Sequence, residues 1–390
     1  MKRKLAMKAL SILTRMMLLM LAGCAAAEPP ISSATPSPAH TAIPTGTQTP
    51  APTPTPPFLP PLEVISIENA SRARLLQTLP IPDFSSATVS QCSAAFSPDG
   101  SLLAAVCDNS TVPVWEVNSG RLQFTLLDEP SHEVAVTFSP DGSQIAIGGF
   151  SGEIRLFDAA NGLLLATFPA LRSPVWDLDF TPDGERLVAA VFFDGVYAWQ
   201  AADQQLHCSV GAEMTHYSPL SVDVHPSGSP IAFGTALDGI FILDAESGAV
   251  LRRLRIIVPY GDVVFSPDGS LLAGGSDDNR IRLWSTENYE LVGNWVGHRH
   301  WVNGVIFSPD GNLLFSGSHD QTVGIWGVRA GEPLNMLEGH EGVVLRVAVN
   351  PAGTLIASTS WDGTVRLWGV PGEEAGAWRR ASAAGVKDDD

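Results

Sequence analysis

Phe307-Ser308-Pro309-Asp310-Gly311 is the clearest copy of a five-residue marker that divides the chain into units of nearly equal length. The other copies start at Phe96, Phe138, Phe180, Val224, Phe265 and Val349. Their glycines are separated by 42, 42, 44, 41, 42 and 42 residues. Seven copies at this spacing indicate a repeat architecture, in which the units and not the total length determine the fold.

Each marker has the composition of a hairpin turn, because proline presets φ, aspartate bonds its own backbone and glycine adopts a positive φ. Short apolar strands precede and follow it. A third strand ends at a large apolar residue fifteen positions beyond the marker glycine: Trp115, Phe157, Trp199, Leu243, Trp284, Trp326 and Trp368. A fourth segment, such as 291–296, leads to the next unit. Four strands per unit predict an all-β fold, a seven-bladed β-propeller.

The last two units share a further pattern. Gly-His is followed after 22 residues by aspartate, and the large apolar residue lies six positions later. This pattern resembles the WD-repeat family, in which histidine, a strand Ser or Thr, aspartate and tryptophan form a buried hydrogen-bonded network. The resemblance implies this structural role for His298, Ser316, Asp320 and Trp326, and for His340, Ser358, Asp362 and Trp368.

The other units depart from this pattern. Unit five keeps Asp278 and Trp284 but has Ile256 at the histidine position. Units one and two have Asn109 and Ser151 in place of the aspartate, and units three and four carry their aspartate one residue closer to the end of the third strand. We therefore expect these five blades to depend on apolar packing and not on the network.

A ring of blades must be closed. The segment from Val64 to Leu79 precedes the first marker and has the character of an additional outer strand. WD-repeat proteins commonly close their ring with an N-terminal strand that completes the last blade, and we expect the same here, with no exposed edge left. The propeller is predicted over residues 62–380, and the acidic segment 381–390 is predicted to be a disordered tail.

Residues 1–23 have the character of an export signal, with a basic start and a short apolar stretch that ends in Leu21-Ala22-Gly23-Cys24. This ending resembles the lipobox of bacterial lipoproteins, which implies that Cys24 is lipidated and anchors the protein to a membrane. The alternative is an ordinary signal peptide that contains a cysteine. Residues 24–61 are rich in Pro and Thr and are predicted to form a flexible, disordered stalk.

The charge of the chain disfavours nucleic acid as a partner. The formal net charge is -18, and five of the 23 basic residues lie in the export signal. Without the signal, 18 basic and 41 acidic residues remain, which corresponds to -23. Such a surface repels phosphate backbones. The acidity is explained by solubility, or alternatively by a preference for Ca²⁺ or a basic partner.

Two cysteines fall in the first two strands of the first blade. If Phe96 faces Leu103 across the turn, the same register places Cys92 opposite Cys107. An exported protein meets oxidants, so a disulfide is expected, with two small buried thiols as the alternative. Cys208 has no obvious partner.

A binding site is predicted from position alone. In WD-repeat proteins, partners often contact the wide end of the ring through residues just before the network aspartate and at the start of the innermost strand. The matching positions are Phe150, Asp277, His319 and Trp361 in the first set, and His132 and Trp301 in the second. The two tryptophans are the strongest candidates, because aromatic anchors dominate interface energetics. The alternative is that they only cover blade edges.

No catalytic motif supports an enzyme. The sequence contains no HExxH, CxxC, GxSxG or phosphate-binding loop, and the His-Asp-Ser sets recur at one spacing inside blades, which favours a structural role over a hydrolase triad. The innermost strands are expected to present mainly apolar and small side chains to the central channel. We therefore expect no metal and no cofactor.

The resulting hypothesis is a non-enzymatic scaffold that binds a protein or peptide and is lipid-anchored on the outer side of a bacterial membrane. Two alternatives remain: a propeller hydrolase or lyase acting on an envelope substrate, and a glycan- or Ca-binding surface module. The sequence does not determine the oligomeric state.

Overall fold

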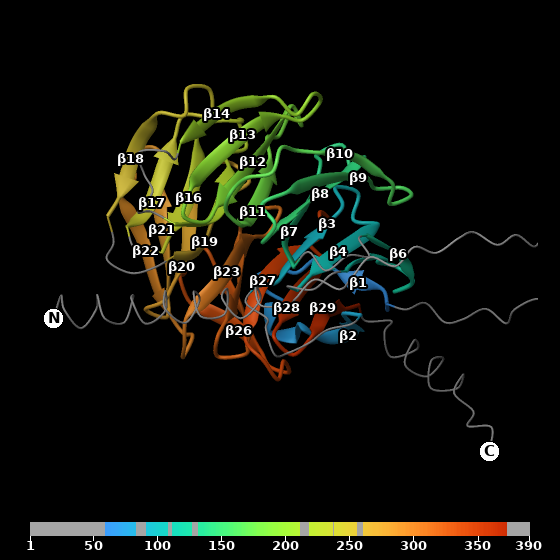
Figure 1. Ribbon diagram of the computed structural model, residues 1–390. Coiled ribbons are helices and arrows are strands. Elements are labelled where there is room, and N and C mark those ends of the chain that lie inside the picture. The colour runs from blue at the N-terminus through green and yellow to red at the C-terminus, as the bar shows by residue number, and fades with distance from the viewer. Residues whose placement is uncertain are drawn as a thin grey trace, which may run out of the picture. The chain divides into compact units, whose positions relative to one another are not determined.

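The computed structural model describes residues 59–82, 91–107, 111–126, 132–210, 218–236, 238–255 and 260–372. Within these residues the strands form seven antiparallel sheets arranged as blades around a central channel (Figure 1). The predicted seven-bladed β-propeller is confirmed. The export signal, the acidic tail and all of the predicted stalk except residues 59–61 lie outside the described residues, so the predicted domain boundaries stay a prediction.

Each of the first six blades contains four strands, numbered from the channel outward. Blade 1 is β3 (Ser93–Phe96), β4 (Leu102–Val106), β5 (Val112–Glu116) and β6 (Leu122–Leu126); blade 2 is β7 (Glu133–Phe138), β8 (Gln144–Gly149), β9 (Ile154–Asp158) and β10 (Leu164–Thr167). Blade 3 is β11 (Val175–Phe180), β12 (Arg186–Val191), β13 (Gly195–Gln200) and β14 (Leu206–Val210).

The second half of the ring repeats this order. Blade 4 is β15 (Pro219–Val224), β16 (Ile231–Thr235), β17 (Gly239–Leu243) and β18 (Val250–Leu254); blade 5 is β19 (Tyr260–Phe265), β20 (Leu271–Ser276), β21 (Arg280–Ser285) and β22 (Leu291–Val296). Blade 6 is β23 (Val302–Phe307), β24 (Leu313–Ser318), β25 (Val323–Gly327) and β26 (Pro333–Leu337).

Blade 7 combines the two ends of the described chain. Its inner strands are β27 (Val344–Val349), β28 (Leu355–Ser360) and β29 (Thr364–Pro371). The outer strand is β2 (Arg74–Pro80), which pairs antiparallel with β29, and the short β1 (Leu62–Glu63) pairs with the far end of β29. A single 3-10 turn, η1 (Ala70–Arg72), lies between them. The expected closure by an N-terminal strand is confirmed.

The marker turns contact one another around one end of the ring. Gly142, at φ 73°, faces Pro98 of the preceding marker, and a Cβ added to Gly142 would lie 3.4 Å from the proline ring. The same relation joins Gly100 of blade 1 to Pro351 of blade 7, also at 3.4 Å. Glycine at these positions therefore permits both the turn and close packing between blades.

The direction of the strands defines two faces. Every innermost strand ends at its marker turn, so the seven markers lie on one face, which we call the marker face. The turns between the second and third strands, and the segments that lead into each innermost strand, lie on the opposite face. We call this the aromatic face, because it carries the aromatic side chains described below.

Candidate functional site

The network of blade 6 connects four side chains in one chain of hydrogen bonds. His298 Nδ1 lies 2.9 Å from Asp320 Oδ2, and His298 Nε2 lies 2.7 Å from Ser316 Oγ. The indole Nε1 of Trp326 donates to the same Oγ at 2.7 Å. These contacts assign the proton of the neutral imidazole to Nδ1, with the serine hydroxyl donating to Nε2.

Blade 7 repeats this geometry. His340 lies 2.7 Å from both Asp362 Oδ2 and Ser358 Oγ, and Trp368 Nε1 donates to that Oγ at 2.8 Å. Both histidine side chains are fully shielded from solvent. Burial alone would raise the pKa of Asp362, but hydrogen bonds from His340 and Thr364 hold it well below its usual value. The arrangement is a satisfied buried network, with no face of the serine open to a substrate.

The aspartates of blades 4 and 5 that precede the third strand each pair with an arginine. Arg282 donates to both carboxylate oxygens of Asp278, with Nη1 3.0 Å from Oδ1, and Arg253 pairs with Asp238. Trp284 is buried in the same blade as Asp278. Both blades have the expected buried apolar core, and each also retains its carboxylate in an ion pair.

An aromatic group lies on the aromatic face between blades 6 and 7. The ring of His319 meets Trp301 edge to face at 4.8 Å and Trp361 at 5.6 Å, and it stacks on His300 at 5.3 Å. Trp361 is 37% exposed. Burial, and then the neighbouring His300, lower the pKa of His319 to about 4, so this imidazole is neutral at pH 7. The structure thus brings three of the predicted partner-binding residues into one group.

A second aromatic group lies on the same face at blades 2 and 3. His132 approaches Phe150 at 6.4 Å, and Phe150 meets the buried Trp176 edge to face at 5.6 Å. Trp176 stacks on Phe192 at 4.7 Å, and the neighbouring Phe193 is 40% exposed. Sequence reasoning missed Trp176, Phe192 and Phe193. Phe193 immediately precedes Asp194, as Trp361 precedes Asp362, so the same positional rule applied to blade 3 finds it.

Asp277, the remaining predicted residue, differs from these aromatic side chains. It lies beside Asp278 in blade 5 and is only partly exposed. Burial, and then the charge of Asp278, raise its pKa to about 7. A carboxyl group in this environment is a weak candidate for a surface contact.

Comparison with known proteins identifies the repeat. The model of the WD domain, G-beta repeat, matches residues 74–116, 120–158, 261–285, 289–327 and 331–369. The described domain is a seven-bladed β-propeller, and five of its segments match the WD repeat. Blades 3 and 4 fall outside the matched segments, and these are the blades in which the aspartate is displaced by one residue.

Curated proteins that are similar to this chain are named for WD repeats or for microtubule association. A WD repeat-containing protein SL1-17 from Schistosoma mansoni is 40% identical over 65 residues, which is 17% of this chain and 22% of that protein. Echinoderm microtubule-associated protein-like 4 from Mus musculus is 39% identical over 89 residues, covering 20% and 9% of the two chains. The Xenopus laevis counterpart is 35% identical over 117 residues, covering 27% and 12%. The chain thus spans under a quarter of the length of each.

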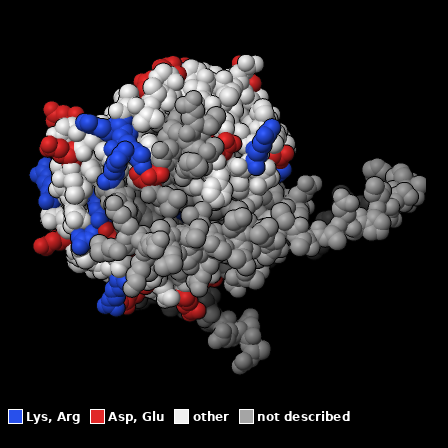
Figure 2. Space-filling view, turned by 60° about the vertical axis from the view of Figure 1, so that its left-hand side comes forward, with Lys and Arg blue, Asp and Glu red and all other residues white. Residues whose placement is uncertain are grey.

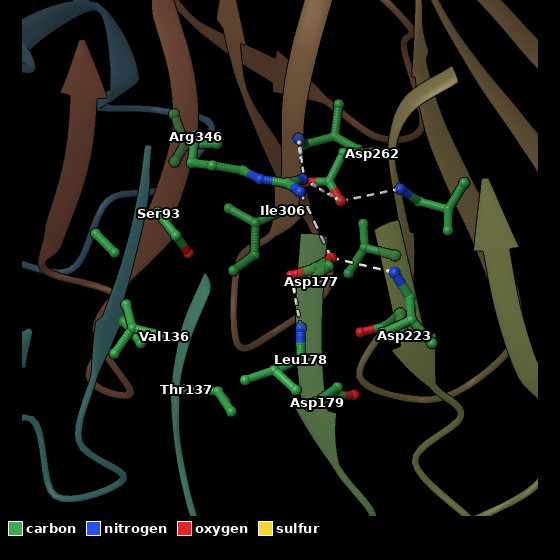
Figure 3. A pocket seen from close by; sticks show the side chains of 17 residues that line it. Ser93, Val136, Thr137, Asp177, Leu178, Asp179, Asp223, Asp262, Ile306 and Arg346 are labelled. Atoms are coloured by element: carbon green, nitrogen blue, oxygen red, sulfur yellow. Dashed lines mark hydrogen bonds and ion pairs between the residues drawn. The ribbon is translucent and has the colours of Figure 1, made fainter. Parts of the chain in front are cut away.

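The central channel of the propeller carries charged side chains among its apolar and small lining residues. A cavity of about 160 Å³ is bordered by four carboxylates and one guanidinium from four different blades: Asp177, Asp179, Asp223, Asp262 and Arg346 (Figure 3). Most of the other lining residues are apolar or small, as expected, but these five charged side chains were not anticipated from the sequence. All five residues lie one or three positions before the first residue of a marker, so strand alternation points them to one side.

The channel carboxylates connect neighbouring blades. Asp179 Oδ2 accepts a hydrogen bond from the backbone N–H of Val224 in blade 4 at 2.9 Å, and Asp223 Oδ2 accepts one from Phe265 in blade 5 at 2.7 Å. Asp177 and Asp262 make the same contact with the next blade, at 3.1 and 3.3 Å. The innermost strands are sheet edges, and these carboxylates therefore satisfy backbone donors that would otherwise face the channel.

Arg346 crosses the channel from blade 7. Its Nη1 lies 2.7 Å from Asp262 Oδ1 in blade 5, and its Nη2 lies 3.5 Å from Asp177 Oδ2 in blade 3. The three side chains retain between 11 and 18% exposure. One guanidinium thus connects three blades that are far apart in the sequence.

The sulfur atoms of Cys92 and Cys107 are bonded in the structure, with the two Cα atoms 4.0 Å apart. The register of β3 and β4 pairs Ser93 with Val106, which places the cysteines opposite each other as the sequence register requires. Cys208 is a free thiol whose pKa is raised by burial. Cys24 lies outside the described residues.

The described part of the chain contains no group of three or more His, Cys, Asp or Glu side chains placed to hold a metal ion. None of its helices has the length and apolar character needed to cross a membrane. On the face in Figure 2, the visible basic and acidic side chains are interspersed, and no continuous basic surface forms among the residues drawn in colour.

Proposed function

We propose that the protein is a non-enzymatic scaffold that binds a protein or peptide through the aromatic face of its WD-repeat propeller. The observation that supports this most directly is the group formed by Trp301, His319 and Trp361. Partly exposed tryptophans held in place by edge-to-face contacts are the kind of anchor that dominates interface energetics. The second aromatic group extends the same face to blades 2 and 3.

The scaffold role agrees with the character of the buried networks. The His-Ser-Asp sets are closed by tryptophan donors, so they lack the accessible nucleophile that a hydrolase requires. Proteins named for WD repeats or microtubule association share the repeats. We infer a protein or peptide partner from the aromatic groups on this chain, and we carry no particular partner over from these relatives.

Affinity capture with the full chain tests the scaffold role. A Trp301→Ala, Trp361→Ala variant is expected to lose at least tenfold in partner recovery from a membrane extract, because truncation of two aromatic anchors costs more than about 2 kcal/mol. The matched control is Leu164→Ala with Leu251→Ala, two exposed apolar residues on outer strands, and it is expected to bind normally. Equal recovery by the aromatic variant and this control would exclude the aromatic face as the binding surface.

We further propose that a lipid on Cys24 holds the propeller on the outer side of a bacterial membrane, with residues 25–58 as a spacer, since Leu59 already packs in the core of the propeller. The support is the Leu21-Ala22-Gly23-Cys24 sequence after an apolar segment. Mass spectrometry of the mature protein should show acyl chains on an N-terminal Cys24, and Cys24→Ser should release the protein from the membrane fraction. A mature protein without acyl mass contradicts the anchor and leaves the binding proposal untouched.

A further inference from the structure

The channel cavity contains an excess of carboxylates over cations. Most of the innermost strands contribute a polar side chain to its lining. Blade 1 provides Ser93, blade 2 Thr137, blade 3 Asp177 and Asp179, blade 4 Asp223, blade 5 Asp262 and blade 7 Arg346, while blade 6 provides the apolar Val305 and Ile306. Among these described lining residues, one guanidinium faces four carboxylates.

Arg346 compensates only part of this charge. It lies within ion-pair distance of Asp177 and Asp262, at the level three positions before the marker. Asp179 and Asp223 lie at the next level toward the marker face. Each of these two accepts a hydrogen bond from a backbone N–H of the next blade, and no cation among the described residues pairs with either.

The environment of the carboxyl groups favours their neutral forms. Burial is the main cause, and the charge of Asp177 adds to it, so the pKa of Asp179 is raised to about 7. Burial likewise raises the pKa of Asp177 to about 6 although Arg346 opposes it, and burial together with Asp179 raises the pKa of Asp223 well above its usual value. Protons on these groups relieve repulsion inside a cavity of about 160 Å³.

We propose that Asp177, Asp179 and Asp223 form a proton-dependent clamp, which holds the junctions of blades 3, 4 and 5 tightly when these carboxyl groups are protonated and loosens the junctions when they ionise. The clamp acts through two linked features. Each Oδ2 is held by a backbone N–H of the next blade, and each charge that appears must be accommodated beside the others in the same cavity.

The sign of the pH dependence follows from proton counting. A carboxyl group whose folded pKa exceeds its unfolded value of about 3.9 binds more protons in the folded state, so it favours folding at low pH. Its contribution falls as the pH rises from about 4 toward the folded pKa. Each such group lowers the folding equilibrium constant by up to about tenfold per pH unit in that window. These carboxyl groups are therefore expected to stabilise the folded ring more at pH 5 than at pH 8.

The test compares the full chain with an Asp179→Asn, Asp223→Asn variant between pH 5 and 8. Asparagine retains the acceptor for the backbone N–H and removes the titrating proton. The wild type is expected to lose more stability than the variant as the pH rises, seen as a steeper fall of the urea midpoint; Asp177 and Asp277, whose pKa values are also raised, leave the variant part of the slope. The matched control, Asp310→Asn in a marker turn, is expected to keep the wild-type slope, because hydrogen bonds from Ser308 and Asn312 lower the pKa of Asp310 despite its burial.

A local measurement separates the clamp from a general effect on stability. Hydrogen–deuterium exchange of peptides that cover β15 and β19, corrected for the intrinsic pH dependence of exchange, is expected to increase from pH 5 to pH 8 in the wild type and to change little in the variant. If the double variant does not fold, the single Asp179→Asn variant replaces it, with about half the loss of slope expected. A variant that keeps the full wild-type slope, or exchange at these strands that does not respond to pH, overturns the proposal.

Discussion

His298 and Asp320 are 22 residues apart in the sequence, yet their Nδ1 and Oδ2 atoms lie 2.9 Å apart inside blade 6. The histidine comes from the segment that leads into the innermost strand, and the aspartate from the turn between the second and third strands. Their contact therefore fixes the distance between two loops of the aromatic face. Because Trp301 and His319 belong to these same loops, the buried network also positions the aromatic group.

Removal of the serine hydroxyl should disrupt this network most directly. Ser316 Oγ accepts from Trp326 and bonds His298, so Ser316→Ala leaves two buried polar groups without this partner. Each such group costs about 1–3 kcal/mol. We expect the free energy of unfolding, measured with urea, to fall by about 2–6 kcal/mol, the sum for the two groups. Ser143→Ala, at an exposed turn serine, serves as the control, and equal losses in the two variants would contradict this role of Ser316.

Acid should weaken the networks of blades 6 and 7. Hydrogen bonds from histidine and threonine outweigh burial and hold the pKa values of Asp320 and Asp362 well below the unfolded value of about 3.9. A depressed folded pKa contributes stability above the unfolded pKa, and this contribution is lost as the pH falls toward the folded pKa. Unfolding midpoints should thus decrease below about pH 4, and less steeply in Asp362→Asn. If the unfolding midpoint of this variant decreases with falling pH as steeply as that of the wild type, Asp362 does not contribute to the acid sensitivity.

The turn between the second and third strands offers a reciprocal pair of substitutions. Gln321 of blade 6 has φ 72°, and its counterpart Gly363 of blade 7 has φ 78°. A left-handed conformation costs an L-residue about 1–2 kcal/mol, which glycine avoids. Gln321→Gly should therefore stabilise the protein and Gly363→Gln should destabilise it, each by about 1 kcal/mol in thermal unfolding. Shifts of the same sign in both variants would contradict this account.

The disulfide of blade 1 should matter for stability although it spans a short loop. Cys92 and Cys107 are 15 residues apart, and closing a loop of that size stabilises a fold by about 3 kcal/mol. Cys92→Ala with Cys107→Ala should lower the free energy of unfolding by an amount of this order. The control is Cys208→Ala, which removes a thiol that forms no disulfide. This substitution should change the free energy of unfolding by under about 1 kcal/mol. A double variant as stable as this control would exclude a stabilising role for the disulfide.

The fold was predictable because its signals are local. Each marker contains its own turn residues, and the tryptophan or its substitute follows at a constant distance. The aromatic group was predictable for the same reason, since Trp361 and His319 occupy one position in successive repeats. Phe193 is harder to find, because the aspartate that follows it lies one residue closer to the end of the third strand than in blades 6 and 7.

The channel could not be predicted in the same way. Arg346 and Asp262 are 84 positions apart and belong to blades that are not neighbours in the chain. Asp177 and Asp179 alternate with apolar residues as in any half-exposed strand, so the sequence pattern does not distinguish a channel from an outer surface. Only the closed ring brings these charges into one cavity.

The strand that completes blade 7 has a consequence for how the protein is made. β2 is among the first folded segments to be synthesised, but its partner β29 does not exist until residue 364 has been added. During synthesis or export from the N-terminus, β2 is therefore without its partner strand until the residues of six complete blades have followed it. A molecule whose first six blades fold before β29 is made has an open ring, in which β2 is unpaired and can bind a wrong partner until β29 pairs with it.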